Sequence, residues 1–127
     1  MAEKSLYIYK IQPVRQEMVS EGRTPEEDQI VGEHFSYLER LTQQGVVLLA
    51  GRTLTEDYSG FGIIIFGAES LQAAQKIVRH DPAVAQRVMR PELHPFRGSL
   101  VGQPIPPVLY HISSTPLALI VYNSCVP

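Results

Sequence analysis

The sequence predicts one α+β domain, in which two helices cover one face of an antiparallel four-stranded sheet. Three observations predict this fold class. The chain has 127 residues, 44% hydrophobic and 19% charged, which suffices for one core of ordinary size. Four short apolar runs of strand-like composition alternate with two amphipathic segments of helical period. The two central runs are separated only by a polar turn cluster, as the strands of a hairpin are.

The opening strand is expected over residues 6–11, LYIYKI, because this run is apolar and aromatic apart from one lysine. Pro13 ends it. A short entry segment follows, in which one helical turn is broken by Gly22. Its Arg15 is either a solvated surface charge or a side chain that folds back over a pocket to bind an anionic ligand.

The first long helix has both of its ends marked in the sequence. Thr24 is the expected N-cap, Pro25 suits the first helical position, and Glu27 completes a capping box. Gly45 is a left-handed stop after the helix. Residues that recur at spacings of three and four form a buried stripe that includes a histidine: Ile30, Val31, His34, Tyr37, Leu38 and Leu41.

The central hairpin is expected from strands at residues 46–50 and 61–66, joined by a polar turn. Ser70 then caps a second amphipathic helix. This helix must stop just before Asp81, because Pro82 follows and a residue that precedes proline is pushed out of the helical region.

The last strand is expected over residues 92–100, and Pro91 and Pro95 place it at a sheet edge or at a bulge. The order is therefore strand, helix, strand, strand, helix, strand, which is the ferredoxin-like arrangement. Residues 1–101 form this domain. Residues 102–127 form a Pro-rich C-terminal tail, expected to be loosely packed or disordered; its apolar run LALIVY is either an added or swapped strand or part of an unstructured extension.

The second face of the predicted sheet has no helix to cover it. Ile63 and Ile65, or their neighbours, must point toward that face, because the third strand is apolar nearly throughout. An exposed apolar sheet face of that size usually means a partner. The simplest solution is a homodimer that stacks two such sheets into a barrel-like core.

The composition argues against several classes of protein. A formal net charge of -2 gives no field that would attract nucleic acid or an anionic membrane surface. No segment approaches the ~20 apolar residues of a spanning helix, and Cys125 is the only cysteine, which fits a cytoplasmic protein. No zinc-type spacing, dinucleotide loop or phosphate cradle is found, so we expect neither a metal nor a cofactor.

Several side chains are candidates for contact with a small-molecule ligand. A guanidinium can bind a carboxylate or stabilise an enolate, although an arginine on a surface is as often solvated. A tyrosine one turn after a buried histidine is more often packing than a proton donor. The candidates for substrate binding are Arg15, Tyr37, Arg52, His94 and Arg97.

Four motifs resemble the YCII-related (YciI-like) domain family. They are H-F-S-Y-L-E-R-L at residues 34–41, G-V-V-L-L-A-G-R-T at 45–53, D-P-A-V at 81–84 and H-P-F-R at 94–97. Their order and spacing carry the resemblance, which covers about residues 6–100 and leaves the tail outside. The entry segment, R-x-x-M-V-S-E-G-R-T-P-E-E, resembles one branch of that family.

The resemblance implies a dimeric α+β barrel whose active site pairs His34 of the first helix with Asp81 after the second. One enzyme that resembles the family removes chloride from a hydroxyquinone, so the implied chemistry is cofactor-free proton transfer on a small organic molecule. Asp81 would fix one ring nitrogen, and His34 would act as general base or acid. The expected reaction is elimination or isomerisation of a carbonyl or phenolic compound. The alternative is a non-catalytic small-ligand-binding or accessory module of the same fold.

Both of these residues also have a structural interpretation that the sequence leaves open. His34 is equally consistent with a histidine at the core edge that donates to a backbone carbonyl. Asp81 is also a good N-cap for a short turn that begins at Pro82. One carboxylate can serve both purposes, because one oxygen can cap while the other faces an imidazole.

Overall fold

A computed structural model describes residues 4–102 of the chain. The elements follow the predicted order, and the short turns expected in the entry segment and after Asp81 are one-turn helices: β1 (Ser5–Pro13), α1 (Glu17–Ser20), α2 (Pro25–Gln43), β2 (Val47–Arg52), β3 (Gly62–Ala68), α3 (Leu71–Arg79), α4 (Pro82–Ala85) and β4 (Met89–Phe96). The predicted tail at residues 102–127, apart from its first residue, lies outside the described residues.

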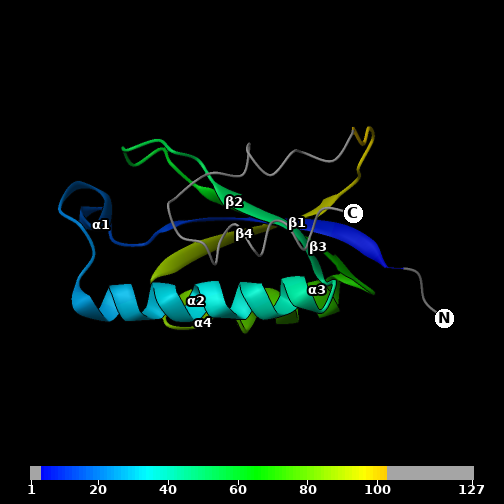
Figure 1. The fold of residues 1–127 in the computed structure, drawn as a ribbon, viewed down its shortest axis with the longest axis horizontal. Helices are drawn as coiled ribbons and strands as arrows, with labels where there is room; N and C mark the ends of the chain where they lie inside the picture. The colour runs from blue at the N-terminus through cyan, green and yellow to red at the C-terminus, as the bar shows by residue number, and fades with distance from the viewer. Residues whose placement is uncertain (1–3, 103–127) are drawn as a thin grey trace.

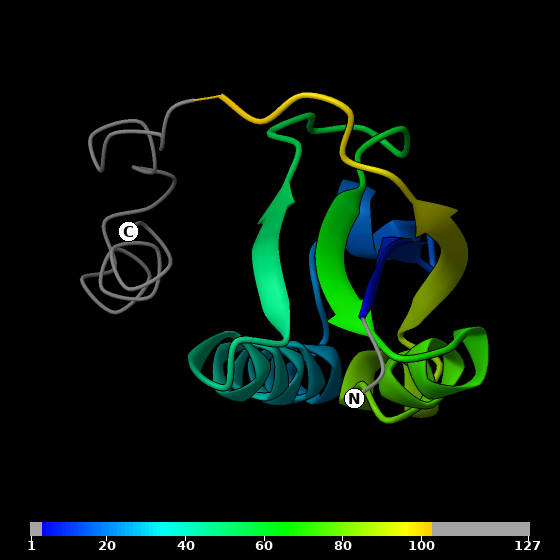
Figure 2. The same ribbon diagram turned by 90° about the vertical axis from the view of Figure 1, so that its right-hand side faces the viewer.

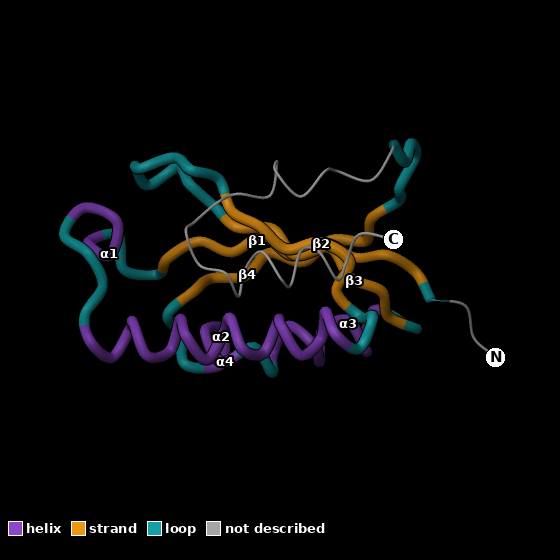
Figure 3. Tube along the Cα trace, in the orientation of Figure 1, coloured by secondary structure: helices purple, strands orange, loops and turns teal. Residues whose placement is uncertain are grey.

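The four strands form one sheet in the order β2-β3-β1-β4, and every neighbouring pair is antiparallel. This is the ferredoxin-like order, so the predicted α+β class is confirmed. Figure 1 shows α2, α3 and α4 together on one face of the sheet, and Figure 3 separates the same two layers by colour. In the turned view of Figure 2, α2 lies beneath β2 while α3 lies beneath the opposite side of the sheet.

The ends of the helices follow from local chemistry, as the sequence predicts. The Thr24 side chain accepts from the backbone N–H of Glu27, and the Glu27 side chain accepts from the backbone N–H of Thr24, which completes the capping box of α2. Gly45 follows α2 with a φ of 79°, in the left-handed region that a glycine adopts without strain. Ser70 caps α3 by accepting from the backbone N–H of Ala73.

The last strand differs from its predicted limits. It covers Met89–Phe96 rather than residues 92–100, because the chain turns sharply at Arg87, whose φ is 60°, and enters the sheet at once. Val14 donates to the carbonyl of Val88, and Met89 then pairs with Pro13. The predicted edge position is confirmed, since β4 is the last strand in the order. Proline has no backbone N–H, and an edge strand tolerates it where that N–H would point away from the sheet.

The core lies between the sheet and the helices. Tyr9 and Phe66 are fully buried at its centre, with their rings edge to face at 5.7 Å between centroids. His34 and Leu38 are the buried residues of α2, so the predicted stripe does face the core. Other members of the core come from β1, β2, β3 and α3: Tyr7, Ile11, Val47, Ile64, Ala68, Ala74 and Val78.

The other side of the sheet, here called the open face, is not covered by any helix of the described residues. Residues paired across neighbouring strands point to the same side, so one row crosses the open face from Leu49 through Ile65 and Ile8 to His94. Leu49 is 43% exposed and Phe96 is 41% exposed. The prediction that apolar side chains point toward an uncovered face is therefore confirmed, whereas the homodimer stays a prediction.

None of the helices in residues 4–102 is both long and apolar enough to cross a membrane. The cytoplasmic location expected from the cysteine count stays a prediction.

Candidate functional site

His34 and Asp81 lie in direct contact, although 47 residues separate them in the chain. His34 projects from the buried stripe of α2, and Asp81 occupies the short link between α3 and α4. Nδ1 of His34 is 2.8 Å from each carboxylate oxygen of Asp81. The side chain of Asp81 is fully buried, while that of His34 is 11% exposed. The helical period and the Asp-Pro link thus bring together the two residues that the family resemblance pairs.

Asp81 receives hydrogen bonds from three directions. Besides His34, the hydroxyl of Tyr9 donates to Oδ2 at 2.9 Å, and the backbone N–H of Ala83 donates to Oδ1 at 2.9 Å. The contact with Ala83 is the N-cap of α4, so capping and imidazole binding do coexist in one carboxylate. Asp81 thus acts as the acceptor in each of these contacts.

This arrangement determines which nitrogen of His34 carries the proton in the neutral ring. Facing an ionised carboxylate, Nδ1 must donate, and Nε2 is then left with its lone pair. Within the described residues Nε2 makes no hydrogen bond, and the only buried side-chain N or O atom without a partner there is Oε2 of Glu39. Nε2 therefore belongs to the part of the ring that solvent reaches, and it is available to accept a proton.

Tyr9 is a member of this group that sequence reasoning missed. Burial, and next the negative charge of Asp81, raise the pKa of Tyr9, so its hydroxyl remains a donor at any ordinary pH. A buried tyrosine usually has a hydrogen-bond partner for its hydroxyl, so a tyrosine in the opening strand was itself a sign of such a partner. The sequence could not tell which partner that was, because Asp81 lies 72 residues away.

Tyr37 is engaged in packing between helices. Its hydroxyl donates to the carbonyl of Ile77 at 2.6 Å and so links α2 to α3. Burial, with a smaller contribution from the charge of Asp81, raises its pKa to about 12. The phenol is consequently neutral at physiological pH.

The other predicted ligand-binding residues lie apart from the His34–Asp81 pair, and no hydrogen bond or ion pair joins them to it in the described structure. The guanidinium of Arg15 donates two hydrogen bonds to the carboxylate of Glu27, from Nη2 to Oε1 at 2.6 Å and from Nε to Oε2 at 2.8 Å. This pair attaches the entry segment to the start of α2. His94 is 2.8 Å from Glu92 on the exposed strand β4. Arg52 ends β2, and Arg97 follows β4; both are exposed.

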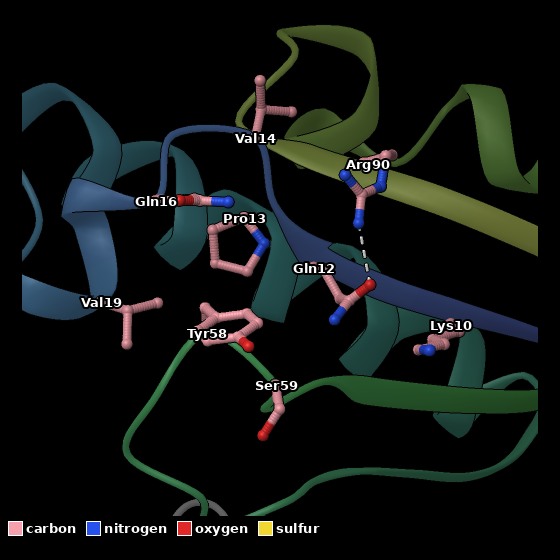
Figure 4. Close-up of a pocket in the computed structure, with 9 residues that line it drawn as sticks. All are labelled: Lys10, Gln12, Pro13, Val14, Gln16, Val19, Tyr58, Ser59 and Arg90. Atoms are coloured by element: carbon pink, nitrogen blue, oxygen red, sulfur yellow. Dashed lines mark hydrogen bonds between the residues drawn. The ribbon is translucent and has the colours of Figure 1, made fainter.

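Two of the hollows in the described structure have the size of a small ligand, and neither of these is lined by His34 or Asp81. One, of about 390 Å³, lies where β1 and β4 meet the entry segment and the β2–β3 loop (Figure 4). The other, of about 460 Å³, lies between α3 and the edge strand β4. Residues 4–102 hold no group of three or more histidine, cysteine, aspartate or glutamate side chains that could bind a metal ion.

Comparison with known proteins gives two findings. The model of the YCII-related domain matches residues 6–96. Among solved structures, 5-chloro-2-hydroxyhydroquinone dehydrochlorinase from Burkholderia phenoliruptrix AC1100, in complex with 2,5-dihydroxybenzoquinone, is similar with a TM-score of 0.55 and 19% identity, over 72% of this chain and 93% of that one. A search of curated proteins gave no significant match. The structural likeness supports the fold, and the family match, which covers most of the chain, shows that this protein belongs to the YCII-related domain family.

Proposed function

We propose that this protein is a cofactor-independent enzyme that moves a proton on a small organic molecule, with His34 as the base and Asp81 as its partner. The observation that carries the proposal is the arrangement around Asp81. All of its donors, including Nδ1 of His34, lie within hydrogen-bond distance, and Nε2 is the ring atom left without a partner in the described residues. A histidine oriented in this way is ready to act as a general base.

The proposed reaction begins with transfer of a proton from the substrate to Nε2. Asp81 stabilises the imidazolium that forms, as the carboxylate of a catalytic triad does. In an elimination, the electron pair of the broken bond to hydrogen forms a double bond and expels a leaving group. In an isomerisation, the proton returns from Nε2 to a different atom of the same substrate. Neither route needs a metal or an organic cofactor.

The substrate class is proposed from the structural neighbour. A dehydrochlorinase removes hydrogen and chloride from its substrate, and the bound dihydroxybenzoquinone is a small oxygenated ring. A carbonyl group acidifies the C–H bond of the neighbouring carbon, and a phenol has an acidic O–H bond of its own. Either proton can be taken by a histidine base. Arg52 and Arg97 lie at opposite ends of the sheet, so each is proposed only as a separate contact for a ligand anion. Arg15, Tyr37 and His94 already hold partners in the protein.

The test is a turnover assay on small carbonyl and phenolic compounds, including chlorinated hydroquinones. His34→Ala should reduce turnover by roughly 10²–10⁴-fold, and Asp81→Asn should also reduce it, because the ring loses the partner that fixes its tautomer. His80→Ala is the matched control, since His80 is an exposed histidine one residue from Asp81. Equal turnover by the wild type and His34→Ala would overturn the proposal.

A second candidate function is a non-catalytic module that binds a small ligand. It is favoured by the separation between the two hollows and the His34–Asp81 pair. On this account the pair is a structural link among α2, β1 and α4. The outcome that would select it is ligand binding without turnover, unchanged in His34→Ala.

The assembly proposed with either function is a homodimer in which two open faces stack. The support is the apolar row of Leu49, Ile65 and Ile8 on a face that no described helix covers. Stacking this face on its own copy is an isologous contact that removes the patch from water on both subunits.

A further inference from the structure

The hollow at the end of β1 is lined by two positively charged side chains. Lys10 and Arg90 both line it, from neighbouring strands, and none of the residues that line it is an aspartate or a glutamate. Lys10 alternates with the buried Tyr9 and Ile11, so it projects on the open face, on the other side of the sheet from the His34–Asp81 pair. The hollow is thus separate from the proposed catalytic site.

The guanidinium of Arg90 is held in place but keeps most of its hydrogen-bonding capacity. Its Nη2 donates to Oε1 of Gln12 at 2.9 Å, the contact drawn as a dashed line in Figure 4. A guanidinium has five N–H donors, and in the described residues Arg90 has no ion pair within salt-bridge distance. The remaining donors can bind an anion bidentately.

Lys10 also has no carboxylate of residues 4–102 at salt-bridge distance. Its ammonium lies 4.9 Å from the centre of the Phe61 ring. The acidic residue opposite it in the β1–β4 ladder is Glu92, whose Oε1 is 2.8 Å from Nε2 of His94. That hydrogen bond is the main cause of the lowered pKa of Glu92, and Lys10 and Arg90 contribute less. The carboxylate of Glu92 is therefore engaged by another residue, and that of Asp57, beside the hollow, accepts from Ser59.

The rest of the lining is mixed: it has an apolar and aromatic part, and a polar part made by Gln12, Gln16 and Ser59. The entry segment supplies Val14 and Val19, and the β2–β3 loop supplies Tyr58, whose ring lies beside Pro13 in Figure 4. A volume of about 390 Å³ is at the lower end of the range for small-molecule sites. A site with two cations, several neutral polar side chains and an apolar part fits a small anion with a compact organic body.

We propose that this hollow binds a small organic carboxylate, with the carboxylate on Arg90 and Lys10 and the apolar body against Tyr58, Val14 and Val19. The site stands independently of the proposed proton transfer, because the two lie on opposite faces of the sheet. Benzoate is the probe, and benzamide, which has nearly the same shape but no charge, is its neutral counterpart.

The experiment measures binding of benzoate to the full chain by titration followed by NMR. Wild type should bind benzoate and should bind benzamide far more weakly. Arg90→Gln and Lys10→Gln should each weaken benzoate binding by roughly tenfold or more, as expected for loss of a hydrogen bond to a charged group, and Arg90→Lys should retain part of it. Tyr58→Ala should also weaken binding, and Tyr58 is 73% exposed, so this change leaves the core intact.

Two controls separate this site from other effects. Arg40→Gln removes the same charge from the exposed surface of α2 and should leave binding unchanged. His34→Ala should also leave it unchanged, which distinguishes this site from the proposed catalytic one. Size-exclusion chromatography of each variant checks that assembly is the same. The proposal is overturned if wild type does not bind benzoate, if benzamide binds as well, or if Arg90→Gln and Lys10→Gln bind like wild type.

Discussion

The hydroxyl of Tyr9 donates a hydrogen bond of 2.9 Å to Oδ2 of Asp81, so the first strand of the sheet holds the carboxylate that in turn holds His34. Tyr9 and Asp81 are both fully buried. A substitution at Tyr9 should therefore change both the free energy of unfolding and the position of the His34 ring.

Tyr9→Phe should lower the free energy of unfolding by about 1–3 kcal/mol, because a buried charged acceptor loses one of its three donors. The phenyl ring can keep its edge-to-face contact with Phe66. Chemical denaturation measures the change. Tyr7→Phe is the control: Tyr7 is 7% exposed and also packs on Phe66, but its hydroxyl makes no hydrogen bond within the described residues. An equal loss in both variants would contradict the assigned role of the Tyr9 hydroxyl.

Asp81→Asn should destabilise the protein even though the two side chains have nearly the same shape. Three donors converge on the carboxylate, from His34, Tyr9 and Ala83, and an amide replaces one acceptor oxygen with a further donor. We expect a loss of about 1–3 kcal/mol or more in the free energy of unfolding. Combining Asp81→Asn with Tyr9→Phe should cost less than the sum of the two, since both changes disturb one network. Strict additivity in that double-mutant cycle would argue against coupling through Asp81.

The sequence predicted best what depends on residues close together in the chain. The capping box of Thr24 and Glu27 and the stop at Gly45 belong to single turns, and each is found as expected. The start of β4 was predicted three residues too late, because it is determined by a contact between Val88 and Val14, far apart in the chain. Alternation in a strand does not reveal such partners.

The same distinction applies to the candidate site. The helical period placed His34 on the buried side of α2, while the pairing with Asp81 came from the family resemblance and not from any spacing. The role of Tyr9 was not predicted, since Tyr7 and Tyr9 have the same pattern in the sequence. Two interpretations of Arg15 were open, a solvated surface charge or a side chain that folds over a pocket to bind an anion. Its guanidinium binds Glu27, a partner that neither interpretation named.

The pH dependence of stability should contain a contribution from Glu27. The hydrogen bonds from Arg15, and next the backbone N–H of Thr24, lower its pKa from an ordinary 4.5 to about 2. Because the folded pKa is the lower one, the stabilisation is fully present above about pH 4.5 and is lost as the pH falls toward 2. The melting temperatures of wild type and Glu27→Gln should therefore differ at neutral pH and converge in acid. Glu26→Gln, in the same helical turn, should give no such convergence.

Two glycines, one inside α2 and one just beyond its end, should respond oppositely to alanine. Gly32 lies inside the helix, and a Cβ there meets nothing within 4 Å, so Gly32→Ala should raise the free energy of unfolding by about 0.5–1 kcal/mol. Gly45 has a φ of 79° just beyond the helix, where an added Cβ is strained, so Gly45→Ala should lower it by roughly 1 kcal/mol. Thermal denaturation of both variants measures the difference. Changes of the same sign would contradict the backbone description of α2.

The proposed homodimer makes a prediction about Ile65, which lies between Leu49 and Ile8 in the row across the open face. Ile65→Lys places a charge at the centre of the proposed contact, and a charge buried without a partner is costly. Wild type should sediment as a dimer and Ile65→Lys as a monomer with unchanged circular dichroism. Phe35→Lys is the control, because Phe35 is 43% exposed on α2, in the helical layer, and should remain dimeric. A monomeric wild type would mean that the apolar open face is covered by something other than a second copy.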